Sequence, residues 1–123
     1  MDRDRFERLV RKVVEGLPEE LLHHMDNVAV VVQDHPSSRQ LSKVGLEKRQ
    51  TLLGLYEGIP QTQRGAHYGL VLPDKITIFR RPIEAICRSE TEVMAEVERV
   101  VKHEIAHHFG ISDARLRQIE HGE

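Results

Sequence analysis

The sequence V-K-H-E-I-A-H-H-F-G-I-S-D, residues 101–113, lies near the C-terminus and decides how the rest of the chain is interpreted. It contains the string H-E-x-x-H-x-x-G-x-x-D, formed by His103, Glu104, His107, Gly110 and Asp113. Each residue of an α-helix turns the chain by about 100°, so His103 and His107 lie on one face, about 40° apart. Two imidazoles placed in this way can bind one metal ion. Glu104 lies beside them, where it can reach a metal-bound water without being a ligand.

Gly110 and Asp113 make the pattern more specific. A catalytic zinc ion takes three protein ligands and keeps one position open for water. Gly110 stands where a helix can end in a left-handed residue, and the chain can then turn to bring Asp113 back as a carboxylate ligand. The alternative is a histidine-bearing amphipathic helix with a glycine cap and nothing bound. The number of spacing constraints met together favours the metal site.

The string H-E-I-A-H-H-F-G-I-S-D resembles the signature of the small, single-domain, zincin-like metallopeptidases of bacteria, and is similar to the ligand pattern of the metzincins. The likeness continues through L-L-G-L-Y-E-G-I-P (residues 52–60) and L-P-D-K-I-T-I-F-R (residues 72–80). This resemblance implies that His103, His107 and Asp113 bind one zinc ion and that Glu104 is the general base.

Two details qualify the resemblance. The metzincins place a methionine-containing turn after the third ligand, whereas here no methionine follows Met94. Some zincins take a glutamate from a later helix, which makes Glu120 and His121 rival third ligands. Asp113 fits the glycine turn better.

Length and composition indicate one domain, residues 1–123. The formal net charge is −2, so nothing in the composition favours nucleic acid or an anionic membrane as a partner. The apolar runs are too short to span a bilayer, and the N-terminus lacks the apolar segment of a secretory signal. A single cysteine, Cys87, excludes an internal disulfide and suits the cytoplasm.

The N-terminal half predicts two helices and a strand. Apolar residues recur at helical spacing from Phe6 to Leu17, and a short second helix follows over Glu19–Met25. His23 and His24 in that helix have no partner at ligand spacing and are interpreted as packing or surface histidines. The β-branched run Val28–Val32 predicts a strand buried on both faces. The polar residues 34–50 predict loop or irregular structure.

The middle of the chain predicts two further strands. Thr51–Glu57 forms one, weakened by Gly54, and the alternating Lys75–Arg80 forms a half-buried other. By analogy with zincins, residues 76–80 are expected to form the rim along which a peptide adds as an extra strand. Arg80 and Arg81 could meet a substrate carboxylate, or be exposed arginines without such a role. Residues 58–69 form a long polar loop that could rim the site through His67 or Tyr68, or be a plain connector.

The C-terminal third predicts the helix that carries the site. Ser89–Glu92 is a capping box, and Val93, Val97, Val100 and Val101 form the apolar stripe of the helix. Cys87 is expected to be a small buried hydrophobe rather than a zinc-capping thiolate. His108 is expected to pack beside the site without joining it. A last helix, Ala114–Glu120, turns Leu116 and Ile119 inward.

Together these features predict an α+β, zincin-like minimal metalloprotease domain, with a small mixed sheet packed on the active-site helix. The expected function is zinc-dependent peptide-bond hydrolysis with Glu104 as general base on a zinc-bound water and a peptide or protein as substrate; Tyr68 and His108 are weak candidates for stabilising the oxyanion. Two alternatives stay open. One is a metal-dependent endoribonuclease, which the absence of a clear basic stripe disfavours. The other is a non-catalytic binding module stabilised by its metal, which has no need of a base at Glu104.

Overall fold

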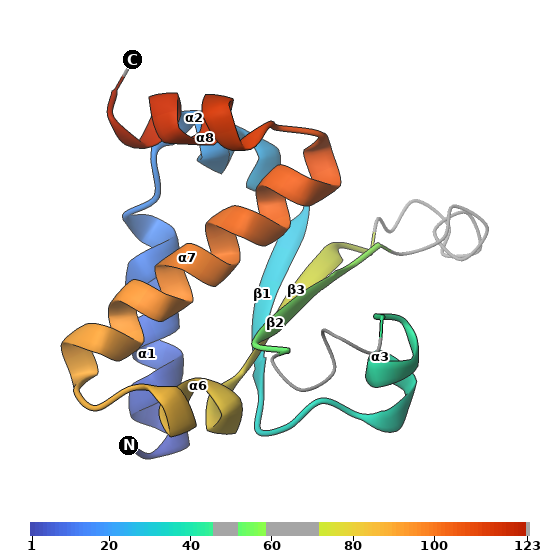
Figure 1. Cartoon of the computed structure of the whole chain (residues 1–123), viewed down its shortest axis with the longest axis vertical. Coiled ribbons are helices and arrows are strands. Elements are labelled where there is room, and N and C mark those ends of the chain that lie inside the picture. Colours follow the sequence, from blue (N-terminus) through green and yellow to red (C-terminus); the bar gives the residue numbers. More distant parts are fainter. Residues whose placement is uncertain (46–51, 59–71, 123) are drawn as a thin grey trace.

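The computed structural model describes residues 1–45, 52–58 and 72–122, which fold into a mixed three-stranded sheet and several helices (Figure 1). The predicted α+β class is therefore confirmed. In chain order the elements are α1 (Arg3–Glu15), α2 (Glu19–Leu22), the 3-10 helix η1 (His23–Met25), β1 (Val28–Gln33), α3 (Ser38–Ser42), β2 (Gly54–Glu57), β3 (Asp74–Phe79), α6 (Arg80–Ile86), α7 (Glu90–Phe109) and α8 (Asp113–Glu120).

The helices of the N-terminal quarter form as predicted. Asp2 caps α1 by accepting a hydrogen bond from the backbone N–H of Arg5 (2.8 Å), and Gly16 ends the helix. The second predicted helix appears as α2 followed directly by η1. Within the described ranges, no helix has the length and apolar character needed to cross a membrane.

The strand order of the sheet is β1-β3-β2, with β1 parallel and β2 antiparallel to β3. The prediction for β1 was wrong in one respect. It is an edge strand, and Val31 is 37% exposed, so the strand is not buried on both faces. A run of β-branched residues fits an edge strand equally well when only one of its faces meets the core.

The half-buried character predicted for Lys75–Arg80 was also wrong. The last four residues of β3, from Ile76 to Phe79, are all buried, including Thr77 at 0% exposure. β3 is the central strand of the sheet, and both of its faces are covered from Ile76 to Phe79, so Thr77 does not mark a solvent-facing side. Alternation in sequence therefore gave the wrong answer at the centre of the sheet.

A short helix that was not predicted, α3, interrupts the polar stretch after β1. Ser37 and Gln40 form a reciprocal capping box, with the Ser37 Oγ accepting from Gln40 N at 3.1 Å and Gln40 Oε1 accepting from Ser37 N at 2.9 Å. The polar composition of α3 resembles that of a loop, and for this reason the sequence did not predict a helix here. These local side-chain bonds satisfy the first turn and allow the helix to form.

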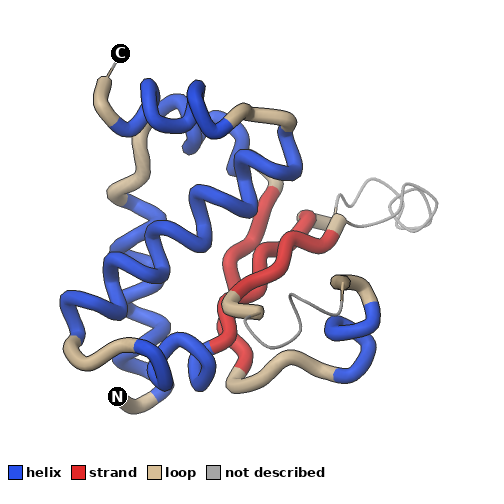
Figure 2. Tube along the Cα trace, in the orientation of Figure 1, coloured by secondary structure: helices blue, strands red, loops and turns tan. Residues whose placement is uncertain are grey.

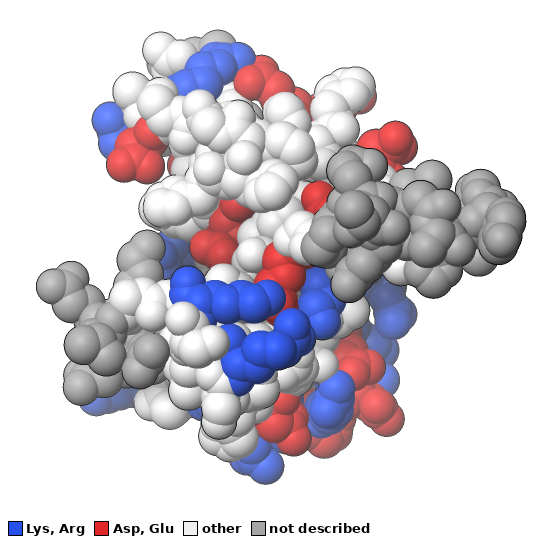
Figure 3. Space-filling model, turned by 90° about the vertical axis from the view of Figure 1, so that its right-hand side faces the viewer, with Lys and Arg blue, Asp and Glu red and all other residues white. Residues whose placement is uncertain are grey.

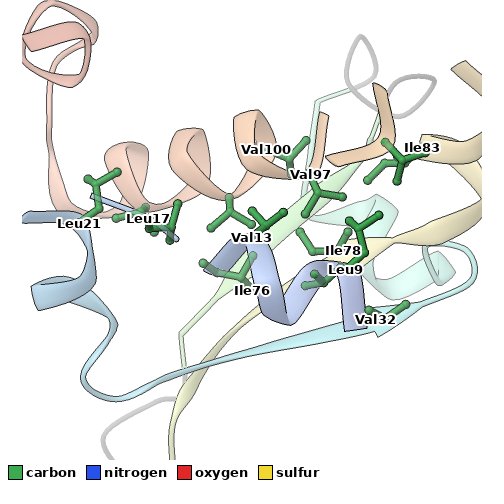
Figure 4. Close-up of a cluster of buried hydrophobic side chains, with 14 of the residues drawn as sticks. Leu9, Val13, Leu17, Leu21, Val32, Ile76, Ile78, Ile83, Val97 and Val100 are labelled. Atoms are coloured by element: carbon green, nitrogen blue, oxygen red, sulfur yellow. The ribbon is translucent and has the colours of Figure 1, made fainter. Parts of the chain in front are cut away.

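The core lies between the sheet and the helices α1 and α7. Figure 2 shows α1, α6 and α7 gathered on one side of the three strands and α3 on the other side in this view. Side chains from α1, β3 and α7 meet in the cluster drawn in Figure 4, among them Val13, Ile76 and Val97. Leu116 and Ile119 of α8 join the same cluster, as the sequence predicted. This packing holds α7 across the sheet and determines which face of α7 stays accessible.

Candidate active site

Helix α7 carries the motif, and its start and apolar stripe agree with the prediction. The Ser89 side chain accepts a hydrogen bond from Glu92 N (3.1 Å), but the Glu92 carboxylate bonds to Arg88 N (3.0 Å) rather than to the N-cap. The four predicted stripe residues are all buried: Val93, Val97, Val100 and Val101. The stripe fastens α7 to the core and leaves His103 and Glu104 half-buried and His107 exposed.

The helix ends at the predicted glycine. Gly110 has φ 70° and ψ 26°, the left-handed conformation that glycine adopts without steric cost. The N–H of Ile111 then bonds to the carbonyl of Ala106 at 2.8 Å, which closes the last turn. Ser112 caps α8 through Arg115 N (3.0 Å), and Asp113 is the first residue of that helix.

His103 and His107 open into one hollow of about 410 Å³ between α7 and β2, which we call the α7–β2 hollow. Glu104 and Glu96 of α7 also line it, and Gly54 of β2 lies on the opposite wall. The structure therefore brings both predicted imidazole ligands and the predicted general base to a single accessible site.

Glu104 is held by the backbone of β2. Its Oε1 accepts a hydrogen bond from the N–H of Tyr56 at 2.8 Å. In an antiparallel pair alternate residues point their backbone groups away from the partner strand. The carbonyl of Leu53 accepts a hydrogen bond from Phe79 N, so Leu53 points its backbone groups toward β3. Tyr56 lies an odd number of residues further along the strand, so its N–H points away from β3, toward α7. This partner was missed by sequence reasoning, although Tyr56 lies within the stretch L-L-G-L-Y-E-G that carried the resemblance.

The third ligand is not assembled with the histidines. Among the described residues, no group of three histidine, cysteine, aspartate or glutamate side chains is arranged to hold a metal ion. Asp113 is exposed at the start of α8. Two imidazoles, an adjacent carboxylate and a further carboxylate just past the glycine turn are the donor types that zinc takes, so the set fits zinc in kind.

The rival ligand Glu120 has another partner. Its Oε2 accepts a hydrogen bond from Lys102 Nζ at 3.1 Å, and Lys102 also pairs with Glu98 at 2.6 Å. Glu120 and His103 line a separate, smaller hollow of about 220 Å³. His121 is an exposed residue at the end of α8.

The rim predicted over residues 76–80 was wrong. Both edges of β3 are occupied, by β1 and β2, so no peptide can add to it. Arg80 begins α6 and is 6% exposed, with its guanidinium 3.0 Å from Asp34 and 3.1 Å from Glu84. It is a buried structural cation and not a contact for substrate. The strand that borders the α7–β2 hollow is β2.

Among the side residues His108 packs as predicted, Cys87 is less buried than predicted, and two lie outside the described ranges. Cys87 is half-buried against the core, where burial, followed by the charges of Glu96 and Glu92, raises the pKa of its thiol. His108 stacks on the ring of Tyr56 and does not line the α7–β2 hollow. The predicted rim residues, numbers 67 and 68, are not among the described residues.

Charges of both signs surround this part of the molecule. Figure 3 shows acidic side chains set back between a largely uncharged upper half and a group of basic side chains below. Two carboxylates line the α7–β2 hollow, and Glu96 is hydrogen-bonded to Arg99. Glu104, the carboxylate beside the histidines, has no cationic partner in the described contacts.

Comparison with known proteins supports the resemblance seen in the motif. A family model described as zincin-like metallopeptidase matches residues 25–123, which include β1, the whole sheet, α7 and α8. The comparison with curated proteins found no match.

Proposed function

The chain belongs to the zincin-like metallopeptidase family, and we propose that it is a zinc-dependent peptidase in which His103, His107 and Asp113 hold one zinc ion and Glu104 is the general base. Family membership supports metal-dependent peptidase activity. The observation that carries the finer proposal is the placement of Glu104, beside both imidazoles and bonded to Tyr56 N–H.

Zinc, when bound, would lower the pKa of water to about 7 and polarise the substrate carbonyl. Glu104 takes a proton from the water that attacks the peptide carbonyl and delivers it to the leaving nitrogen as the C–N bond breaks. The Tyr56 N–H orients the carboxylate during both transfers, because its hydrogen bond holds one oxygen of Glu104 in place.

Strand β2 is the proposed docking edge for the peptide. Gly54 and Tyr56 alternate with the residues that bond to β3, so their backbone groups point away from β3. The N–H of Tyr56 binds Glu104, so the backbone groups proposed to meet the peptide are those of Gly54, which lines the α7–β2 hollow. An extended peptide can add along such an edge through main-chain hydrogen bonds, which explains why a small domain needs no deep pocket. This role passes from residues 76–80, where sequence analysis placed it, to β2.

The test is Glu104→Gln, which keeps the hydrogen bond to Tyr56 N–H but removes the base. We expect zinc content to be unchanged and peptide hydrolysis to fall by about 10²-fold or more. The matched control is Glu96→Gln, the same chemical change in the same hollow, which should retain activity. Hydrolysis retained by Glu104→Gln would rule out the proposed mechanism.

A further inference from the structure

Four rings form a continuous cluster at the C-terminal end of α7. Tyr56 and His108 are stacked, with centroids 3.8 Å apart and planes inclined by 12°. Phe109 meets both edge-on, at 6.1 Å from Tyr56 and 4.9 Å from His108. His24 of η1 lies 4.5 Å from Phe109 on the other side. We call this cluster of His24, Tyr56, His108 and Phe109 the aromatic platform.

The platform is accessible to solvent. Phe109 is 39% exposed, and the side chain of His108 is 40% exposed. A single exposed aromatic side chain needs no explanation, but four contiguous rings drawn from η1, β2 and α7, two of them imidazoles, form an aromatic surface that a ligand side chain can cover. Tyr56 is partly buried against the main core cluster, so the ring anchors the platform to the fold.

The platform is continuous with the candidate active site. Tyr56 supplies its backbone N–H to Glu104 and its ring to the platform. On α7, His108 and Phe109 directly follow the proposed ligand His107, and His108 stands four residues after Glu104, on the same face of the helix. A peptide held along β2 would therefore carry a side chain over these rings.

The charges at the platform favour a peptide over a nucleic acid. The Tyr56 hydroxyl donates to Asp74 Oδ2 at 2.8 Å, and the same oxygen is 4.0 Å from His108 Nε2. The backbone N–H of the same Tyr56 binds the Glu104 carboxylate. Stacked nucleobases bring phosphates that the Glu104 carboxylate would repel, whereas an uncharged apolar side chain carries no such penalty.

We propose that the aromatic platform binds an aromatic or large apolar side chain of the peptide substrate next to the bond that is cleaved. As a statement about cleavage, this proposal rests on the peptidase function proposed above. As a statement about binding, it stands on the exposed rings alone and can be tested without hydrolysis.

The experiment measures binding to the zinc-loaded full chain carrying Glu104→Gln, followed by the NMR signals of His24 and His108. The probes are three blocked peptides, N-acetyl-Gly-X-Gly-amide with X as Phe, Leu or Ser. We expect the Phe peptide to bind about tenfold more tightly than the Ser peptide, the gain that an aromatic contact provides. The Leu peptide should lie between them.

Variants at Phe109 locate the effect. Phe109→Ala should reduce the preference for Phe over Ser to about twofold or less, and Phe109→Leu should keep part of it because the apolar bulk remains. Val31→Ala, which shortens an exposed apolar side chain on β1, is the control and should leave the preference unchanged. Equal binding of the three peptides, or an unchanged preference in Phe109→Ala, would overturn the proposal.

Two further results would also overturn it. Tighter binding of a short oligouridylate than of the Phe peptide would make the platform a nucleic-acid surface. Dimerisation of the protein that Phe109→Ala abolishes would make it a contact between two copies of the chain. Peptide hydrolysis by the wild-type chain is measured separately. A binding preference without hydrolysis would rule out the peptidase function and support the platform as a binding surface. Hydrolysis without a binding preference would support the peptidase function and rule out the platform.

Discussion

Glu57, the last residue of β2, is a buried carboxylate whose partners come from α3, the helix that the sequence did not predict, and from its C-cap. Its Oε2 lies 2.6 Å from Lys43 Nζ, and its Oε1 accepts from Gln40 Nε2 at 3.2 Å. Burial by itself would raise the pKa of this carboxyl. The hydrogen bonds from Lys43 and Gln40 outweigh burial and hold the pKa below its usual 4.5. The ionised form of Glu57 is therefore the form that stabilises the fold.

The sign of the pH dependence follows from this lowered pKa. The stabilising contribution of Glu57 is fully present above about pH 4.5, its usual pKa in an unfolded chain, and is lost as pH falls through the lower pKa of the folded state. We expect Glu57→Gln to reduce the free energy of unfolding by about 1.5–3 kcal/mol at pH 7, with a smaller difference from wild type at acid pH. Urea unfolding at pH 7 and near pH 3 measures both quantities.

An exposed carboxylate provides the control for Glu57. Glu20 forms two hydrogen bonds to Arg115, at 2.6 and 2.7 Å, but its side chain is 50% exposed. Glu20→Gln makes the same chemical change and should cost about 1 kcal/mol or less, because exposed ion pairs contribute little. If the two variants lost equal stability, burial would not be what makes Glu57 important.

The close approach of β2 to α7 depends on Gly54. A Cβ at this position would lie 2.4 Å from Val100 Cγ1 and 3.2 Å from the Thr77 carbonyl. The sequence suggested that Gly54 weakens the strand. In the structure it is what lets the backbone of β2 lie against the helix, and this contact brings Tyr56 N–H within reach of Glu104.

We predict that Gly54→Ala destabilises the fold by about 1–3 kcal/mol, because the added methyl group must push β2 away from α7. Urea unfolding measures the loss. Peptide hydrolysis should fall as well, since the hydrogen bond from Tyr56 to Glu104 would lengthen.

Two further variants identify the cause. Gly45 has no atom within 4 Å of an added Cβ and does not have a positive φ, so Gly45→Ala should be neutral or stabilise by up to about 1 kcal/mol. Combining Gly54→Ala with Val100→Ala removes the clashing methyl, and the loss should be smaller than the sum of the two single losses. Simple additivity would show that the contact with Val100 is not responsible.

At the scale of the whole molecule, the position of Asp113, the proposed third ligand, depends on how α8 is docked. Leu116 and Ile119 anchor this helix in the core, Lys102 pairs with Glu120 near its end, and Arg115 ties its first half to Glu20 in α2. Burial lowers the pKa of Lys102, but the hydrogen bonds that it donates to Glu98 and Glu120 outweigh burial and raise the pKa above 10.5. Lys102 is thus charged at neutral pH, which keeps the Glu120 carboxylate engaged.

This arrangement predicts that Asp113, and not Glu120, completes the proposed zinc site. At a zinc concentration of 100 times its dissociation constant, the wild-type chain should gain about 2.7 kcal/mol of stability. Asp113→Ala should lose most of this gain. Glu120→Gln should lower the stability of the zinc-free chain, because Lys102 loses a partner, but should keep the gain from zinc.

Chemical unfolding with and without zinc, together with elemental analysis of the purified protein, measures these effects. About one zinc ion per chain is expected for the wild type. The opposite pattern, with the zinc effect lost in Glu120→Gln and kept in Asp113→Ala, would assign Glu120 as the third ligand. No zinc effect in the folded wild-type chain would remove the metal site.

The sequence by itself determined the parts of this protein that depend on local chain geometry. The spacing of His103 and His107, the valine stripe of α7 and the left-handed turn at Gly110 follow from helical periodicity and from backbone sterics, which act over a few residues. The histidine spacing and the glycine turn belong to the motif that carried the resemblance, which the match to the family model confirmed.

Tertiary structure alone decided the order of the strands and all that depends on it. A sequence pattern shows how apolar and polar residues alternate along a strand, but not which strands lie beside it. Only the folded chain makes β1 an edge strand, β3 the central strand and β2 the wall of the α7–β2 hollow. The bond from Tyr56 to Glu104 joins residues 48 positions apart, and the burial of Glu57 depends on α3. Such contacts arise when the core packs distant segments together, and no local pattern encodes them.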